Sequence, residues 1–107
     1  MELNIRGNHL EITPSLRTYV EEKIGSLAHY GGGLIRIEVE LTYDVSGREA
    51  NSFHADARIE LPGPDLRAEV SASEMHAAID ILQNKLKSQL LKHKERELSK
   101  RRRGNRP

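Results

Sequence analysis

The chain has 107 residues, which fits one domain with a modest core, and no cysteine, which excludes a disulfide scaffold, a thiolate metal site and a cysteine nucleophile. Its net charge of +1 hides a strong separation, because residues 85–107 hold ten Lys or Arg and two acids, whereas residues 1–84 have a net charge of −7. Apolar runs are short and the N-terminus lacks the apolar region of a signal peptide, so we expect no membrane span and a cytoplasmic protein.

The first third of the chain predicts a strand followed by a helix. Leu3 and Ile5 alternate with polar residues, which is typical of a short strand. Thr13 and Pro14 then fit the N-cap and the first position of a helix. The apolar residues that follow at helical spacing are Leu16, Val20, Ile24 and Leu27. The three glycines at 31–33 are predicted to end this helix.

Three strands are predicted next, over residues 35–43, 53–61 and 66–72. In each of them apolar and polar residues alternate, which indicates one buried face and one solvated face. The connections, residues 44–52 and 62–65, suit antiparallel hairpins.

A long second helix is expected from Ser73–Glu74 onward. Its apolar stripe consists of Met75, Ala78, Ile79, Leu82, Leu86 and Leu90. The order β-α-β-β-β-α predicts an α+β fold in which two helices cover one face of a four-stranded sheet, as in double-stranded RNA-binding domains. Residues 1–95 are expected to form this domain, and residues 96–107 a flexible basic C-terminal extension.

The basic residues of the second helix fall into rows beside its apolar stripe. At about 100° per residue, Lys85, Lys92, Arg96 and Arg103 project on one side of the stripe. Lys87, Lys94 and Arg101 project on the other side. Since the stripe stops near Leu90, the helix is predicted to outrun the sheet. Beyond Leu90, the side of the helix that carried the apolar stripe is occupied by His93, Glu97 and Lys100.

This concentration of positive charge favours a polyanionic partner. Lysine-rich helix ends are common and often only solvated, because they complement the helix dipole. Ten basic residues in the last 23, ending with three consecutive arginines at 101–103, exceed what that explanation requires. After Leu91 the segment has almost no large apolar residue apart from Leu98, so it is too polar for an amphipathic membrane helix. Nucleic acid is the polyanion that remains.

The predicted solvated face of the sheet points to the kind of contact. It has no aromatic platform on which bases could stack, and its charges are expected to pair across strands. They are Arg36, Glu38, Glu40, Asp56, Arg58, Glu60, Arg67 and Glu69. We therefore expect contacts mainly to phosphates, with specificity from the shape of the site.

Other candidate residues are fewer. Lys23 lies within the apolar stripe of the first helix, where it is either a lysine at the rim of the core or a second phosphate contact. The five histidines share no metal-ligand spacing, although His93 among its lysines could donate to phosphate. No catalytic constellation is evident, so we expect neither an enzyme nor a metal or cofactor.

Several segments resemble the ribosome hibernation promoting factor family, also called the ribosome-associated inhibitor or S30AE family. They are residues 3–7 with 12–24, Leu61-Pro62-Gly63 with Leu66-Arg67-Ala68, and residues 75–80 running into Lys85-Leu86 and Gln89-Leu90. The match covers residues 1 to about 95 in order. The family usually has Tyr where this chain has His76. Long family members add a C-terminal domain, so this chain resembles a short form.

The resemblance implies a stationary-phase or stress factor that binds the small ribosomal subunit and the 70S ribosome. Such a factor occupies the mRNA and tRNA channel, inhibits translation and preserves idle ribosomes, and it would be a monomer off the ribosome. Carried over by position, Lys23, Lys85, Lys92 and neighbouring bases of the second helix would be the 16S rRNA contacts. Together with the bases of the overhang and His93, the expected contact set is Lys23, Lys85, Lys87, Lys92, His93, Lys94, Arg96, Lys100, Arg101 and Arg103.

Two alternatives remain from the sequence. A generic double-stranded RNA-binding module has a similar fold, but it places its lysine cluster at the start of the final helix, where this chain has Glu74-Met75-His76. A sigma-54 modulation-type regulator would instead bind a protein through the acidic body or the polar sheet face.

Overall fold

The computed structural model describes residues 1–30, 33–46 and 50–104, with side chains through residue 99. It contains four strands, two α-helices and one 3₁₀ helix in these ranges. In chain order they are β1 (Glu2–Asn8), α1 (Pro14–Lys23), η1 (Gly25–Tyr30), β2 (Arg36–Tyr43), β3 (Phe53–Glu60), β4 (Leu66–Ala72) and α2 (Met75–Gly104).

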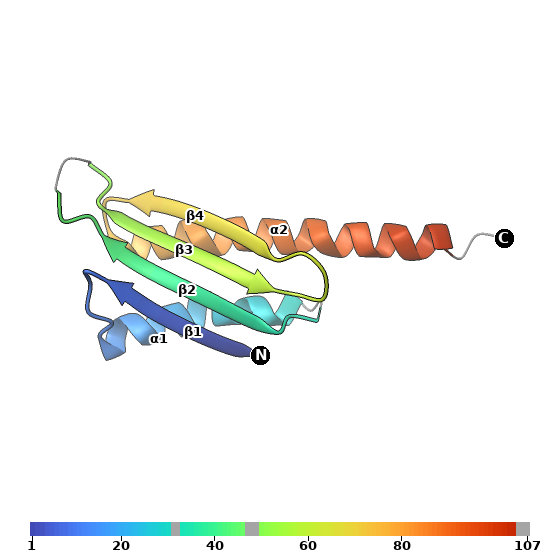
Figure 1. Ribbon diagram of the computed structural model, residues 1–107, viewed down its shortest axis with the longest axis horizontal. Coiled ribbons are helices and arrows are strands. Elements are labelled where there is room, and N and C mark those ends of the chain that lie inside the picture. The colour runs from blue at the N-terminus through green and yellow to red at the C-terminus, as the bar shows by residue number, and fades with distance from the viewer. Residues whose placement is uncertain (31–32, 47–49, 105–107) are drawn as a thin grey trace.

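The strands form one sheet in the order β1-β2-β3-β4. The β1 strand runs parallel to β2, because α1 and η1 connect them, and the two hairpin-linked pairs are antiparallel. Both α-helices lie on the same face of the sheet, with α1 behind β1 and β2 and α2 behind β3 and β4 (Figure 1). The predicted α+β order and the single helical layer are therefore confirmed.

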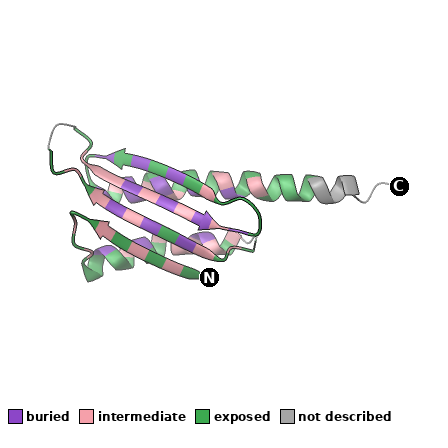
Figure 2. Cartoon of the chain, in the orientation of Figure 1, coloured by how far each residue is buried: buried purple, intermediate pink, exposed green. Residues whose placement is uncertain are grey.

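The core lies between the sheet and the two helices. The strand register places Ile37 opposite Leu3 and Ile59, so that apolar side chains of neighbouring strands share the helix-covered face. Ile37 and Ile59 are fully buried, as are Leu82 and Leu86 of α2. Burial alternates along the strands with the period that the sequence predicts (Figure 2).

The start of α1 follows the expected capping chemistry. The Thr13 hydroxyl oxygen accepts a hydrogen bond from the Leu16 backbone N–H at 3.1 Å, and Pro14 is the first helical residue. The second helix begins at Met75, one residue after the predicted start at Ser73–Glu74.

The prediction of one continuous first helix up to the glycines is wrong. The α-helix ends at Lys23, and the chain continues as the 3₁₀ helix η1. The Ser26 hydroxyl donates to the Lys23 carbonyl oxygen at 2.8 Å, while the Leu27 N–H bonds to the Ile24 oxygen instead, three residues back. Residues 31 and 32 lie outside the described part of the chain, and Gly33 has a φ of 72°, in the left-handed region.

Helix α2 is much longer than the sheet that it covers. Its 30 residues span roughly 45 Å at 1.5 Å per residue, whereas strands of seven or eight residues span about 25 Å. Of the α2 side chains that the structure describes, the last buried one is Leu90, and the helix continues beyond the sheet to Gly104 (Figures 1 and 2). The molecule therefore measures 60 × 26 × 17 Å. The helix passes position 95 without a break, while the domain boundary there and the flexibility of the extension stay predictions.

Two leucines of α2 should respond very differently to truncation. Leu86 is fully buried and Leu98 is 45% exposed on the overhanging part. We expect Leu86→Ala to lower the free energy of unfolding by about 2–5 kcal/mol, because it opens a cavity in the core. Leu98→Ala should change it by less than about 0.5 kcal/mol. Chemical denaturation measures both values, and equal losses would contradict the division of α2 into a packed and an overhanging part.

Candidate nucleic-acid interface

One side of α2 is hydrogen-bonded to the edge strand β4. The Lys85 ammonium donates to the Glu69 backbone oxygen at 3.3 Å, and the Gln89 side-chain amide donates to the Arg67 backbone oxygen at 2.9 Å. These contacts satisfy carbonyl groups of an edge strand and fix the rotation of the helix about its axis. Lys85 nevertheless remains exposed, with donors left for a further partner.

The other side of α2 faces α1 and η1. There the Lys87 ammonium lies 5.5 Å from the centre of the Tyr30 ring, within the range of a cation–π interaction. The Gln83 side-chain amide donates to the Ser26 hydroxyl at 3.4 Å. Lys85 and Lys87 therefore lie on opposite sides of the buried stripe, as the helical projection predicts.

Lys23 is the last residue of α1 and lies at the rim of the core. Its ammonium is 4.0 Å from an Asp80 carboxylate oxygen and 5.7 Å from the Tyr19 ring centre. The side chain is 40% exposed. The interpretation as a rim lysine thus fits its position, and the phosphate contact stays a prediction.

The overhanging part of α2 carries the next predicted contacts. Lys92, Lys94 and Arg96 are exposed, and His93 is half-buried. Lys100, Arg101 and Arg103 belong to the helix, but their side chains lie outside the described part. Leu91 and Leu98 are also exposed, and among the side chains described beyond Leu90 none is buried in the core.

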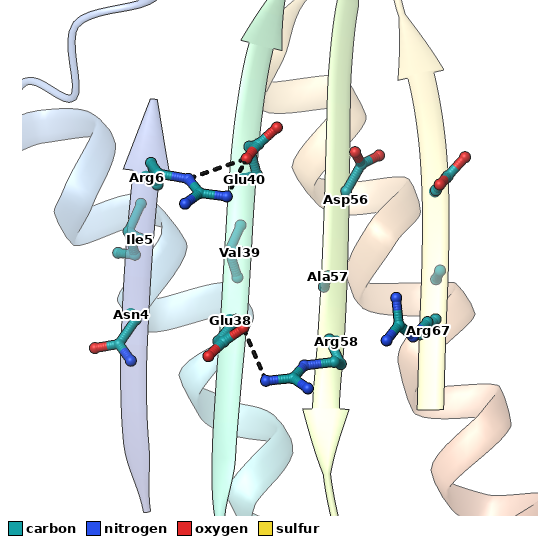
Figure 3. A pocket seen from close by; sticks show the side chains of 12 residues that line it. Asn4, Ile5, Arg6, Glu38, Val39, Glu40, Asp56, Ala57, Arg58 and Arg67 are labelled. Atoms are coloured by element: carbon teal, nitrogen blue, oxygen red, sulfur yellow. Dashed lines mark hydrogen bonds and ion pairs between the residues drawn. The ribbon is translucent and has the colours of Figure 1, made fainter. Parts of the chain in front are cut away.

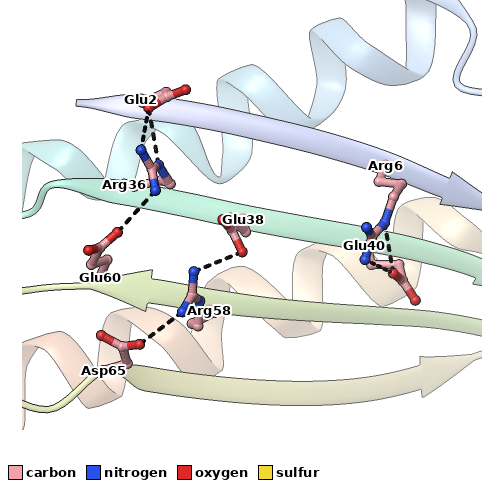
Figure 4. A network of polar contacts seen from close by, with 8 residues as sticks. All are labelled: Glu2, Arg6, Arg36, Glu38, Glu40, Arg58, Glu60 and Asp65. Carbon is pink, nitrogen blue, oxygen red and sulfur yellow. Dashed lines mark hydrogen bonds and ion pairs between the residues drawn. The ribbon is translucent and has the colours of Figure 1, made fainter.

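The face of the sheet that the helices leave uncovered carries both arginines and carboxylates, unlike the basic surface of α2. Arg6, Arg36 and Arg58 are paired with carboxylates of neighbouring strands or of the β3–β4 turn (Figure 4). Arg67 lies opposite Arg58, and among the described residues no carboxylate pairs with it, so the predicted pairing fails there. The pairs are Arg6 with Glu40, Arg36 with Glu2 and Glu60, and Arg58 with Glu38 and Asp65. The prediction that strand charges pair across the sheet is confirmed for these residues. At the surface, such pairs contribute little stability each and mainly neutralise the arginines locally.

A shallow depression of about 730 Å³ lies on this open face (Figure 3). Asp56 lies in it, aligned across the strands with Glu40 on one side and Glu69 on the other. Partial burial, and then the charges of Glu69 and Glu40, raise the pKa of Asp56 above its ordinary value. This row therefore brings three carboxylates side by side, although Arg6, Arg58 and Arg67 line the same depression.

The fold therefore places mostly paired charges on the open sheet face and the lysines of α2 beside the helical layer. The strands direct their charged side chains away from the helices, while the lysines of α2 flank the helical layer. Among the described residues, no group of three or more acidic, His or Cys side chains could hold a metal ion. No helix within the described ranges is long and apolar enough to cross a membrane.

Three residues of this region were not predicted from the sequence. Tyr19, Tyr30 and Asp80 contact the candidate lysines, but none of them is a cation. The spacing of Tyr19 four residues before Lys23 on one helix could have suggested their contact. No local signal connects Lys87 with Tyr30 or Asp80 with Tyr19, because these partners lie far apart in the sequence.

The fold and the charge distribution define a class of protein. It is a small α+β domain in which the open face of the sheet carries paired charges, and the second helix extends a basic surface beyond the edge of the sheet. The chain belongs to the family described as "Sigma 54 modulation protein / S30EA ribosomal protein", which matches residues 3–97. The family resemblance drawn from the sequence is therefore confirmed.

Curated relatives carry names that agree with one another. A "Ribosome hibernation promoting factor" of Azotobacter vinelandii is 36% identical over 107 residues, covering 100% of this chain and 94% of the relative. That of Escherichia coli (strain K12) is 36% identical over 96 residues, covering 90% and 96%. A "Ribosome hibernation promotion factor" of Bacillus subtilis is 38% identical over 96 residues, covering 88% of this chain but only 49% of the relative.

Two solved structures share the fold. The N-terminal domain of Thermus thermophilus Protein Y matches with a TM-score of 0.71 and 31% identity, over 84% of this chain and 96% of that one. A ribosomal subunit interface protein from Coxiella burnetii matches with a TM-score of 0.74 and 26% identity, over 89% and 99%.

The acidic row on the open face should cost stability at neutral pH. Because folding raises the pKa of Asp56, its ionisation opposes folding above its unfolded-state pKa of roughly 3.9. We expect Asp56→Asn to raise the melting temperature by about 1–3 °C at pH 7, and the gain to vanish as the pH falls below about 4. Thermal unfolding across this pH range measures the effect. Glu38→Gln, which removes the ion pair with Arg58, serves as the control and should give no such gain.

Proposed function

We propose that this protein is a ribosome hibernation factor of the bacterial cytoplasm. It binds the small ribosomal subunit through 16S rRNA in the mRNA and tRNA channel, inhibits translation and preserves idle ribosomes in stationary phase or stress, in the 70S ribosome as well. Off the ribosome it is a monomer, and it acts by occupancy rather than by catalysis. The names of its relatives support the hibernation role, and this chain covers nearly the full length of those from Azotobacter vinelandii and Escherichia coli.

The observation that carries the rRNA contact is the rigid presentation of positive charge along α2. Lys85 is fixed against β4 and Lys87 against Tyr30, so two exposed cations flank a helix that the core holds in place. Lys92, Lys94 and Arg96 extend this surface beyond the sheet. A fixed array of cations fits folded RNA, in which the phosphates also have fixed positions, better than flexible single strands.

The remaining predicted contacts extend this surface at both ends. Lys23 adds a cation from α1, and His93 adds a donor among the lysines of the overhang. Lys100, Arg101 and Arg103 add charge toward the end of α2. The acidic row on the open sheet face disfavours RNA there, so only the helical side docks.

A protein-binding regulator is the second candidate function, and the depression on the open sheet face favours it. That face is uncovered and presents carboxylates to a partner with basic side chains. Variants of the two faces separate the candidates, because rRNA binding depends on the helical lysines and protein binding on the sheet.

The central experiment is co-sedimentation with purified small subunits over a salt series. We expect binding of the wild type to fall steeply with salt, with a slope of about −0.7 to −0.9 in log–log units per phosphate contact. Changing Lys85, Lys87, Lys92 and Lys94 to Glu should weaken binding by about 100-fold or more, because each change replaces an attraction by a repulsion.

A matched pair of variants separates local contacts from net charge. Lys87→Gln with Lys94→Gln, and Arg6→Gln with Arg67→Gln, remove the same charge from the helical and the sheet side. The first pair should weaken binding and lower the salt slope by about two, whereas the second should change neither by much. If the variant with Glu at positions 85, 87, 92 and 94 still binds small subunits with wild-type affinity, the proposed rRNA contact is wrong.

Removal of residues 101–107 tests the contribution of the extension. The buried stripe of α2 ends at Leu90, so the deletion should leave the melting temperature within about 1 °C. Binding to small subunits should weaken by about tenfold at 100 mM salt, since four arginines are lost. A large drop in melting temperature would show that the extension belongs to the folded core.

A further inference from the structure

The solvent-facing junction between the two helices is lined by polar side chains in matched positions. We define this helix seam as Tyr19, Lys23, Ser26 and Tyr30 on α1 and η1, and His76, Asp80, Gln83 and Lys87 on α2. Each residue meets the one 57 positions later in the sequence. A constant offset means that the two helical segments run parallel and stay in register over this length, so the seam is a regular element of the fold.

Both lysines of the helix seam lie over aromatic rings. Lys23 is 5.7 Å from the Tyr19 ring centre, and Lys87 is 5.5 Å from the Tyr30 ring centre. A ring face attracts the ammonium group without using up its N–H donors, which a carboxylate would do. Lys87 is therefore restrained and remains able to donate to a further acceptor, whereas Lys23 also lies 4.0 Å from an Asp80 carboxylate oxygen and shares its charge with that acid.

Asp80 connects α1 and α2 at the end of the helix seam that contains Tyr19 and His76. The Tyr19 hydroxyl donates to an Asp80 carboxylate oxygen, and this hydrogen bond is the largest cause of a raised pKa for Tyr19. The same oxygen lies 4.0 Å from the Lys23 ammonium, and the His76 ring lies 4.4 Å from the Tyr19 ring. An acid on a basic surface would repel RNA, but here its charge is compensated by Lys23.

The spacing of the two lysines follows from the offset. Lys23 is level with Asp80, and Lys87 comes seven residues later, roughly 10 Å along α2. If both side chains are held by their rings, this separation is maintained before any partner arrives. Such a pair can contact two phosphates at once only where the RNA presents them at a matching distance.

We propose that Tyr19, Tyr30 and Asp80 are positioning residues that hold Lys23 and Lys87 at a fixed separation and thereby favour folded rRNA over flexible polyanions. This inference rests on the proposed function, since it concerns how the rRNA-contacting lysines are presented. The benefit arises because a restrained side chain loses less conformational entropy on binding. Releasing one lysine should weaken binding by about two- to tenfold.

The test is a double-mutant cycle on Tyr30 and Lys87, read by affinity for purified small subunits. Tyr30→Leu removes the ring and keeps an apolar side chain, whereas Tyr30→Phe keeps the ring face. We expect Tyr30→Leu to weaken binding by about two- to tenfold and Tyr30→Phe to restore it to within about twofold. Combining Tyr30→Leu with Lys87→Met should be no worse than Lys87→Met alone, because the tyrosine acts through the lysine.

Selectivity gives a readout that stability alone would not move. Polyuridylate is flexible, so its affinity should change less than about twofold on Tyr30→Leu, while that for small subunits falls. The same comparison applies to Asp80→Ala, which removes the acceptor of the Tyr19 hydroxyl, with Asp80→Asn keeping an oxygen in that place. Measurements are made well below the melting temperature of each variant.

The possible outcomes distinguish failure of the positioning role from failure of the proposed function. If Lys87→Met weakens small-subunit binding but Tyr30→Leu does not, or if their effects add, the positioning role is wrong and the proposed function stands. Equal losses for small subunits and polyuridylate on Tyr30→Leu also overturn positioning. If neither Lys87→Met nor the quadruple lysine change affects small-subunit binding, the proposed rRNA contact fails, and positioning with it.

Discussion

The burial of one narrow apolar stripe of α2 against β3 and β4 is the interaction on which the rest of the structure depends. Ile79, Leu82 and Leu86 are fully buried in it, and Leu90 closes it. Because the stripe is narrow, the residues beside it emerge on two sides of the helix, one toward β4 and one toward η1. Because it ends at Leu90, the helix leaves the sheet and carries its cations into solvent.

The separation of charge follows from the same packing. In a sheet covered on one face, the period of two sends every second side chain to the uncovered face. There Arg6, Arg36 and Arg58 form ion pairs with carboxylates, which neutralise their charge locally. Among the side chains that the structure describes, no ion pair joins Lys85, Lys87, Lys92 or Lys94 to a carboxylate, so their charge is available for a partner. A chain that is nearly neutral overall can thus present a strongly basic surface.

The family match extends beyond the part of α2 that packs against the sheet. The family covers residues 3–97, and by residue 97 α2 has already left the sheet. The alignment with the Azotobacter vinelandii relative nevertheless extends over the whole chain. The part of α2 that the core fixes and the part that overhangs therefore differ in physical support, although both have counterparts in a relative.

Local patterns were enough to predict the elements and the basic surface. The alternation in strands and the helical spacing of the stripe depend only on near neighbours, and so do the capping by Thr13 and the two rows of cations on α2. The overhang could also be predicted, because the last apolar residue of the stripe can be read directly from the sequence.

The tertiary structure decided what depends on competition or on distant partners. The first helix changes to a 3₁₀ helix after Lys23, where the Ser26 hydroxyl donates to the Lys23 carbonyl and the Leu27 N–H bonds three residues back, and residue composition does not settle which of these local hydrogen bonds forms. The ring beneath Lys87 comes from Tyr30, 57 residues away, and the acceptor for Tyr19 comes from Asp80. The sequence by itself determined where positive charge lies along α2, whereas only the packing of two helices on one sheet decided which of those charges are held in place.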